Sequence, residues 1–207
     1  MPDLSRERKC LKLGKVRVAG IDEAGRGPLA GPVSAAAVIL PPRFRCPELD
    51  DSKKLNPKKR RDLYLRITEN PAVIWSVAMA DVSEIDSINI LRATHLAMRR
   101  AVESLAAQPD HCLIDGLPVR DFPISHDGIV GGDGLSLSIA AASVIAKVTR
   151  DSHMLSLHEE FPQYGFARHQ GYGTKEHLEA LRVHGPCCHH RVSFQPVSQL
   201  TLPFDLG

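Results

Sequence analysis

Residues 16–40, VRVAGIDEAGRGPLAGPVSAAAVIL, decide the fold class of this chain. Apolar and polar side chains alternate over residues 16–22, which predicts a half-buried strand that reaches Asp22. A turn rich in glycine and proline follows. The apolar run over residues 33–40 then predicts a second, buried strand.

The rest of the chain alternates predicted helices with predicted strands. We expect a loose or helical leader over residues 1–15, strands over 72–82, 111–115 and 124–130, and helices over 57–68, over about 88–105, from Ser136 or Ser138 through Val148, and from Thr174 to Gly185. This order favours an α/β fold with a central mixed β-sheet flanked by helices, plus a helical C-terminal region. Without a linker or repeat, residues 1–207 are expected to form a single domain, its core at about 16–198.

Composition excludes several classes of protein. The chain has 207 residues, 43% of them hydrophobic and 24% charged, which excludes intrinsic disorder. It lacks an apolar run of the ~18 residues that a membrane span needs and an N-terminal signal peptide. Five cysteines without a C-x-x-C pair indicate reduced thiols in a cytoplasmic protein. We interpret residues 187–190, CCHH, as a surface turn because their spacing does not suit zinc.

Four acidic residues stand where a sheet would present ligands. Asp22 and Glu23 end the first predicted strand, Asp115 ends the strand over 111–115, and Asp133 lies among glycines. In α/β sheets, ligands bind at the carboxyl ends of strands. Clustered carboxylates repel one another, and oxygen-only ligands suit Mg²⁺ or Mn²⁺. Two such ions, about 4 Å apart, would hold both reacting oxygens of a phosphodiester. Each acid alone is explained more simply as a turn former or a helix cap.

Asp22 and Glu23 raise a geometric objection, because adjacent residues of a regular strand point to opposite faces. Both reach one site only if the strand ends or bulges there, and Gly25 permits such a break. Gly25-Arg26-Gly27 would let a ligand approach the backbone, with Arg26 on a phosphate, or it is an ordinary tight turn. A P-loop and a Rossmann fingerprint are both missing.

Basic and aromatic clusters admit two interpretations each. The run KKRR at residues 58–61 either grips a nucleic-acid backbone or forms a solvated helix face. Tyr164, Phe166 and Tyr172 either stack on sugars or bases, or pack a loop.

Taken together, these residues resemble the ribonuclease HII (type 2 ribonuclease H) family. The resemblance is carried by six blocks in order, which span about residues 16–198: DEAGRGPLAGPV at 22–33, DSKKL at 51–55, LIDG at 113–116, GD at 132–133 with IAAASVIAKVTRD at 139–151, GYGT at 171–174, and HRVSF at 190–194.

The resemblance implies an RNase H-like fold and an endoribonuclease that cleaves the RNA strand of RNA–DNA hybrids. It also implies incision 5′ of single ribonucleotides embedded in duplex DNA, leaving 3′-hydroxyl and 5′-phosphate ends, with roles in ribonucleotide excision repair and DNA replication. By the same likeness, the residues that hold two Mn²⁺ or Mg²⁺ ions are Asp22, Glu23, Asp115 and Asp133. The implied substrate contacts are Gly25, Arg26 and Gly27 on the ribose 2′-hydroxyl, Tyr172 on the neighbouring deoxyribose, and Lys53 and Lys147 on phosphates. A 2′-hydroxyl is what distinguishes RNA from DNA.

Three positions depart from the family pattern: Gly131 stands in place of Lys, Leu117 in place of Asn, and Gln170 in place of Lys. The alternative to an enzyme is a catalytically silent hybrid-binding protein, which would gain nothing from repelling carboxylates. A small-molecule phosphatase lacks support without a P-loop. We expect a monomer. The segment after Ser198, with Pro203-Phe204, is either a docking tail or without fixed structure.

Overall fold

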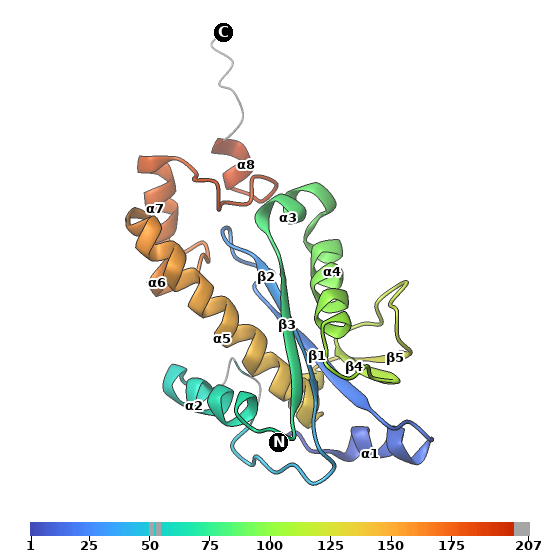
Figure 1. Cartoon of the computed structure of the whole chain (residues 1–207). Helices are drawn as coiled ribbons and strands as arrows, with labels where there is room; N and C mark the ends of the chain where they lie inside the picture. The colour runs from blue at the N-terminus through green and yellow to red at the C-terminus, as the bar shows by residue number, and fades with distance from the viewer. Residues whose placement is uncertain (50–51, 53–54, 201–207) are drawn as a thin grey trace.

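A computed structural model describes residues 1–49, 52 and 55–200, and its centre is one mixed sheet (Figure 1). The strands are β1 (Val18–Ala24), β2 (Val33–Ile39), β3 (Ile74–Ala80), β4 (His111–Asp115) and β5 (His126–Ile129). Their order is β3-β2-β1-β4-β5. β2 runs antiparallel to β1 and β3, whereas β1, β4 and β5 run parallel. The expected mixed α/β sheet is therefore confirmed, with strand ends that shift by up to two residues.

Two long helices cover the two faces of the sheet (Figure 1). Helix α5 (Leu137–Glu160) packs its small apolar first half against Ala36 and Val38 of β2. Helix α4 (Ile90–Glu103) packs against the opposite face, where Ala35 and Ala37 of β2 point. Because alternate residues of a strand face opposite sides, the alanine run of β2 offers a short side chain to each helix. Small side chains allow both helices to lie close to the sheet.

The helix expected over about 88–105 is confirmed as α4, but the short helix before it was not expected. The structure has two helices, α3 (Val82–Ile88) and α4, separated at Asn89. Asn89 adopts φ 69°, and its side chain accepts a hydrogen bond from the N–H of Arg92, so it caps α4. Leu91, expected on the apolar face, is half exposed as a result.

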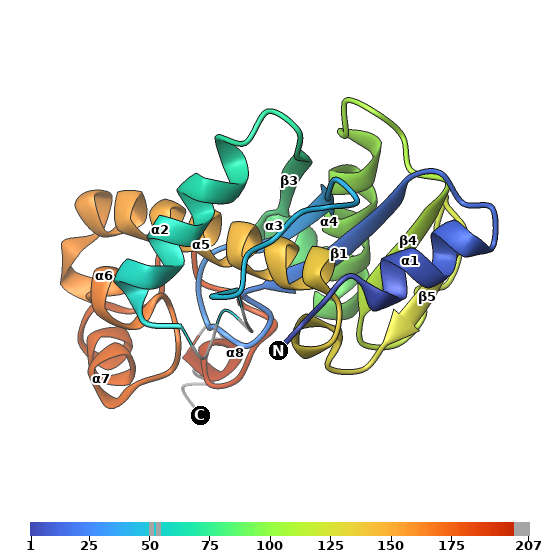
Figure 2. The same cartoon turned by 90° about the horizontal axis from the view of Figure 1, so that it is seen from below.

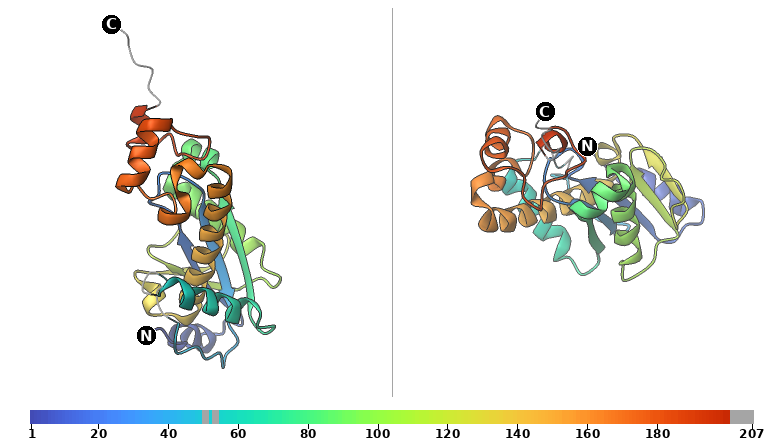
Figure 3. Two further views of the ribbon diagram at one scale, coloured as in Figure 1. Left: turned by 90° about the vertical axis from the view of Figure 1, so that its left-hand side faces the viewer. Right: turned by 90° about the horizontal axis from the view of Figure 1, so that it is seen from above.

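The other helices begin at the caps that the sequence predicts. Asn56 caps α2 (Pro57–Thr68), and Thr174 caps α7 (Lys175–His184), each through a side-chain oxygen that accepts a backbone N–H. Helix α6 (Phe166–His169), α7 and α8 (Val197–Leu200) gather at one end of the molecule, opposite α1 (Ser5–Lys12) (Figure 3). This confirms the helical C-terminal region. Among the described residues, no helix is both long enough and apolar enough to cross a membrane.

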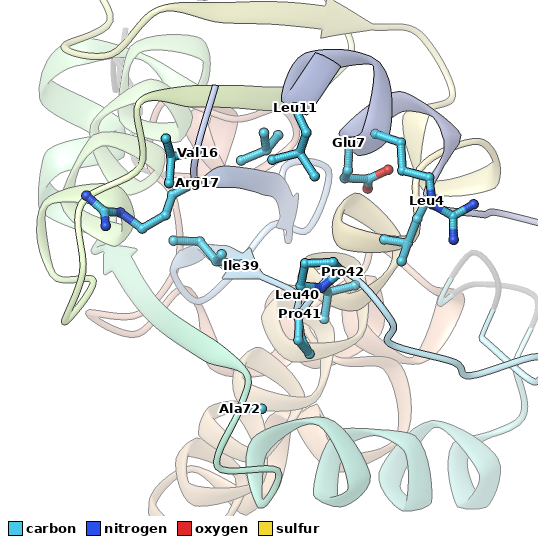
Figure 4. A pocket seen from close by; sticks show the side chains of 12 residues that line it. Leu4, Glu7, Leu11, Val16, Arg17, Ile39, Leu40, Pro41, Pro42 and Ala72 are labelled. Carbon is cyan, nitrogen blue, oxygen red and sulfur yellow. The ribbon is translucent and has the colours of Figure 1, made fainter. Parts of the chain in front are cut away.

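Helix α1, which forms most of the leader, lies beside β4 and β5 (Figure 2) and is hydrogen-bonded to the start of α5. Its buried Glu7 accepts hydrogen bonds from the hydroxyls of Ser136 and Ser138, and from the N–H of Ser138, at the start of α5. A carboxylate at a helix N-terminus is stabilised by the helix dipole. A cavity of about 190 Å³ lies between α1, the start of β1 and the end of β2, and it is lined mainly by apolar side chains (Figure 4).

Candidate active site

Parallel pairing brings Asp22 and Asp115 to the same end of the sheet. The register of β1 and β4 pairs Ile21 with Ile114, so the two aspartates are the next residues on neighbouring strands. Both isoleucines pack on the α4 side. Because side chains alternate, both carboxyl groups face α5. Asp22 is only 5% exposed.

Glu23 reaches this end of the sheet by a route that the sequence did not reveal. β1 neither ends nor bulges at the acid pair, since its one-to-one pairing with β2 continues to Ala24. The neighbouring strand β4 ends instead, at Asp115, level with Asp22. The β4 side of Glu23 is therefore open, and Glu23 and Asp115 line one cavity. The expected end of the first strand lies one residue beyond the acid pair, at Ala24, where Gly25 adopts φ 97°, and the strand has no bulge.

Asp133 is held in the short 3₁₀ turn η1 (Gly132–Gly134) that leads into α5. The N–H of Gly132 donates to Oδ1 of Asp115 over 2.7 Å, which ties this turn to the end of β4. A Cβ at Gly132 would lie 2.6 Å from Cδ1 of Ile139, so the Ile139 side chain would have to shift to admit it. Asp133 is 9% exposed. All four acids thus lie at one end of the sheet.

The electrostatics of these acids fit a cation. Burial, together with the charges of Glu23 and Asp115, raises the pKa of Asp22 well above its ordinary value. Hydrogen bonds from the N–H of Glu23 and the hydroxyl of Ser143 oppose that shift. A divalent ion would remove the repulsion, and the oxygen-only donor set matches Mg²⁺ or Mn²⁺.

One cavity of about 670 Å³ connects the acids with the expected substrate contacts. Its lining includes Glu23, residues 25–27, Asp115, Lys147 and Tyr172. Lys53 lies outside the described residues, while its neighbour Ser52 lines the cavity. The structure therefore gathers every described residue that the resemblance assigned to the substrate, with Asp22 and Asp133 buried nearby.

Lys147 is fixed by an ionic network on α5 and α2. Its Nζ donates to Oδ1 of Asp151 over 2.7 Å, and Nη1 of Arg60 lies 3.7 Å from Oδ2 of the same carboxylate. Arg60 also donates to the carbonyl of Ser52. Of the basic run at 58–61, Arg60 therefore holds the loop beside the cavity, whereas its three neighbours are exposed.

Two buried arginines shape the glycine loop, and sequence reasoning missed both. Arg191 donates to the carbonyls of Gly25, Arg26 and Gly31 over 2.6–3.0 Å. Arg150 donates to the carbonyls of Ala30, Pro32 and Gln170 over 2.9–3.0 Å. Burial, more than the nearby charge of Arg150, lowers the pKa of Arg191 to about 9, so it is still cationic at neutral pH.

The direction of these carbonyls fixes the direction of the loop's N–H groups. In a planar trans peptide, the carbonyl of one residue and the N–H of the next point in opposite directions. Because the carbonyls of Gly25 and Arg26 point to Arg191, the N–H groups of Arg26 and Gly27 point away from it. The cavity-lining loop can therefore present two backbone donors to a ligand.

Tyr172 is held by a chain of hydrogen bonds between neutral histidines. Nδ1 of His177 lies 2.9 Å from the carbonyl of Tyr172, which can only accept, so this nitrogen carries a proton. Burial lowers the pKa of His177 and of His190 to about 4, so both are neutral at pH 7. Nε2 of His190 then donates to Nε2 of His177 over 3.0 Å, and Nδ1 of His190 accepts the N–H of Cys187.

The buried histidines correct the interpretation of residues 187–190, and the structure assigns different roles to the three aromatic residues Tyr164, Phe166 and Tyr172. Residues 187–190 are more than a surface turn, because His190 is 1% exposed. Tyr164 and Phe166 are buried and pack a loop. Tyr172 is 46% exposed and faces the cavity, and a Cβ on Gly27 would lie 3.7 Å from its ring.

The three departures occupy different environments. Gly131 adopts φ 66°, a conformation that disfavours the lysine expected there. Leu117 is 76% exposed. Gln170 adopts φ 52°, and its carbonyl accepts from Arg150.

Comparison with known proteins identifies the family of this chain. The family model described as "Ribonuclease HII" matches residues 19–197. A ribonuclease HII of Burkholderia pseudomallei (strain 1710b) is 57% identical over 189 residues, which cover 91% of this chain and 86% of that protein.

Two solved structures share the fold. The ribonuclease H2 of Pyrococcus horikoshii OT3 has a TM-score of 0.73 at 24% identity, covering 89% of this chain and 97% of that one. The RNase HII of Archaeoglobus fulgidus, solved as a PCNA:RNase HII complex, has a TM-score of 0.73 at 23% identity, covering 87% of this chain and 96% of that one. From the family match and the 57% identity, the chain belongs to the ribonuclease HII family and is a metal-dependent ribonuclease H.

Proposed function

We propose that this chain cleaves the RNA strand of RNA–DNA hybrids and incises 5′ of single ribonucleotides embedded in duplex DNA, leaving 3′-hydroxyl and 5′-phosphate ends. In this proposal Asp22, Glu23, Asp115 and Asp133 hold two Mg²⁺ or Mn²⁺ ions. The protein acts as a cytoplasmic monomer in DNA replication and repair.

The observation that carries the proposal is one cavity in which Glu23 and Asp115 face residues 25–27 and Tyr172. The pKa of the adjacent Asp22 is raised by burial and by the charges of the two other carboxylates. A bound cation would neutralise this repulsion and stabilise the ionised acids. Bound divalent ions would stabilise the charge that develops on the attacking and leaving oxygens of the phosphodiester.

Backbone and side-chain groups of the protein recognise the ribonucleotide and its neighbours in the substrate. The N–H groups of Arg26 and Gly27, directed away from Arg191, donate to a ribose 2′-hydroxyl, which DNA lacks. Tyr172 stacks on the deoxyribose on the 3′ side, where its exposed ring lies over Gly27. Lys147 and Lys53 contact phosphates. In this proposal, these contacts let one ribonucleotide in DNA direct the cut.

The test uses a labelled DNA duplex with one embedded ribonucleotide and a matched all-DNA duplex. With Mg²⁺ or Mn²⁺ we expect a nick 5′ of the ribonucleotide in the first duplex only, and none with EDTA. Asp133→Asn should abolish the nick while the protein still binds the duplex. Full activity in Asp133→Asn would refute the metal assignment.

Two other outcomes separate the alternatives. If only long RNA–DNA hybrids are cut, the proposal for the 2′-hydroxyl contact and for Tyr172 is wrong. If nothing is cut although the duplex binds, the chain is a silent hybrid-binding protein.

A partner protein is a second proposal. The Archaeoglobus fulgidus relative was solved in complex with PCNA. Here residues 199–204 read QLTLPF, with apolar Leu200, Leu202 and Phe204 at alternate positions. Leu200 is 43% exposed after the buried Val197, and residues 201–207 lie outside the described residues.

We propose that this C-terminal segment docks in an apolar groove of a PCNA-like clamp. Truncation before Gln199 should abolish binding to the clamp of the same organism and leave cleavage of naked duplex unchanged. Equal clamp binding by the truncated and full chains would refute this proposal.

A further inference from the structure

A second group of potential metal ligands lies far from the acids of the active site. Sγ of Cys10 in α1, a ring nitrogen of His111 in β4 and a carboxylate oxygen of Asp127 in β5 all lie within 4.8 Å of one another. His111 begins β4 and Asp115 ends it. At about 3.3 Å per residue, the two groups are separated by about 13 Å along the strand.

The group is assembled from three elements and is open on one side. Cys10 and His111 are 7% and 8% exposed, whereas the side chain of Asp127 is 66% exposed. Cys10 and Asp127 line a cavity of about 440 Å³, through which an ion can enter. Arg6 and Lys9 line the same cavity and weaken its attraction for cations.

His111 has the surroundings of a metal ligand. Its Nδ1 lies 3.1 Å from Oγ of Ser125, and its Nε2 lies 3.3 Å from Oδ2 of Asp127. Metal-bound histidines usually donate their other ring N–H to an oxygen, which fixes the ring. With Ser125 accepting from Nδ1, the lone pair of Nε2 faces the carboxylate, and a cation between them would satisfy both.

The donor set selects the metal. One thiol, one imidazole and one carboxylate suit Zn²⁺, which binds sulfur at about 2.3 Å and nitrogen or oxygen at about 2.0–2.2 Å. Tetrahedral geometry then separates neighbouring ligand atoms by about 3.3–3.7 Å. The pair of His111 and Asp127 already has this spacing. The remaining separations need a contraction of about 1 Å, which the exposed Asp127 and the short helix α1 can supply.

We propose that Cys10, His111 and Asp127 bind one Zn²⁺ ion, with the fourth position open to water. The ion would link α1 to the edge of the sheet formed by β4 and β5. Because Glu7 of α1 also holds the start of α5, the zinc site stabilises the leader and the turn that precedes α5. It takes no part in cleavage.

The test is a titration of EDTA-treated, dialysed full-length protein with Co²⁺, a spectroscopic substitute for Zn²⁺. We expect a thiolate-to-cobalt charge-transfer band in the near ultraviolet at one equivalent. The carboxylates of the active site contain no sulfur, so they cannot produce this band. Zn²⁺ should also raise the unfolding midpoint of the wild-type chain further when it is added on top of saturating Mg²⁺, which occupies the active-site acids.

Variants identify the ligands. Cys10→Ser should abolish the band and the rise of the midpoint that Zn²⁺ gives in saturating Mg²⁺, while Cys46→Ser, at another buried cysteine, should keep both. Asp127→Asn alters an exposed position that tolerates substitution, and should weaken cobalt binding at least tenfold. The proposal is overturned if the wild type shows no sulfur band, if the band survives in Cys10→Ser, or if it is lost in Cys187→Ser instead.

Discussion

A methyl group added at Gly25 should destabilise the protein strongly. Gly25 adopts φ 97°, where a residue with a Cβ is strained by about 1–2 kcal/mol. That Cβ would overlap the side chain of Arg150 and lie 2.9 Å from the carbonyl oxygen of Pro32. Arg150 donates three hydrogen bonds to buried carbonyls, and each bond from a charged donor is worth about 1.5–3 kcal/mol. If one bond is lost, Gly25→Ala costs about 3–5 kcal/mol.

Urea unfolding measures this loss, and Gly27→Ala is the matched control. With a slope of about 2 kcal/mol/M, the midpoint of Gly25→Ala should fall by about 1.5–2.5 M. The nearest contact of a Cβ at Gly27 is the Tyr172 ring at 3.7 Å, an ordinary van der Waals distance. Gly27→Ala should therefore unfold within about 0.5 kcal/mol of wild type, yet cut the embedded ribonucleotide poorly, because the methyl group occupies the cavity.

Either of two results would refute the reasoning. If Gly25→Ala unfolds within about 1 kcal/mol of wild type, Arg150 moves freely and does not fix the loop. If Gly27→Ala loses as much stability as Gly25→Ala, the loop responds to any side chain and the left-handed conformation of Gly25 is not the cause.

Three further predictions concern charge and hydrogen bonding. The folded-state pKa of Asp22 is raised, so without metal this carboxyl group contributes stability that is fully present below the ordinary aspartate pKa and is lost as the pH rises through the folded pKa. Asp22→Asn should remove this loss in thermal unfolding with EDTA, and parallel pH curves of the two proteins would contradict it. Arg191→Lys leaves one ammonium for three carbonyls and should cost about 2–4 kcal/mol in urea. Arg182→Lys, on the surface, is the control and should unfold at the same urea concentration as the wild type. His190→Phe keeps an aromatic ring but leaves Nε2 of His177 without a hydrogen-bond donor, which should lower the free energy of unfolding by about 1–3 kcal/mol. It should also lower cleavage at single ribonucleotides more than cleavage of long hybrids. Equal losses of activity on both substrates would show that the histidines do not position Tyr172.

Elements with local signals could be predicted from the sequence. Asn56 before Pro57 and Thr174 before an apolar-periodic stretch each carry the chemistry of a helix cap, and both helices begin there. Helix α3 could not be found by periodicity, because the apolar pattern that predicts α4 already includes Ile88, the last residue of α3. A single asparagine with a positive φ interrupts the helix without interrupting the pattern.

The candidate site was predictable as a set of residues but not as a geometry. Asp22, Glu23 and Asp115 were identified because acids at strand ends have a local signature. How Glu23 joins the others depends on β4 ending level with Asp22, and that is a property of register between strands far apart in sequence. No pattern within residues 16–28 contains this information.

The supporting residues escaped prediction because backbone carbonyls have no sequence signature. An arginine that pairs with a carboxylate suggests its partner by the presence of an acid, but Arg191 pairs with the carbonyls of residues 25, 26 and 31, about 160 positions earlier. Every residue type offers such a carbonyl. Buried guanidinium groups can therefore turn a loop's carbonyls inward and its N–H groups outward with little trace in the loop's own sequence. In this protein the donors proposed to read the 2′-hydroxyl are oriented by a residue that the substrate does not need to touch.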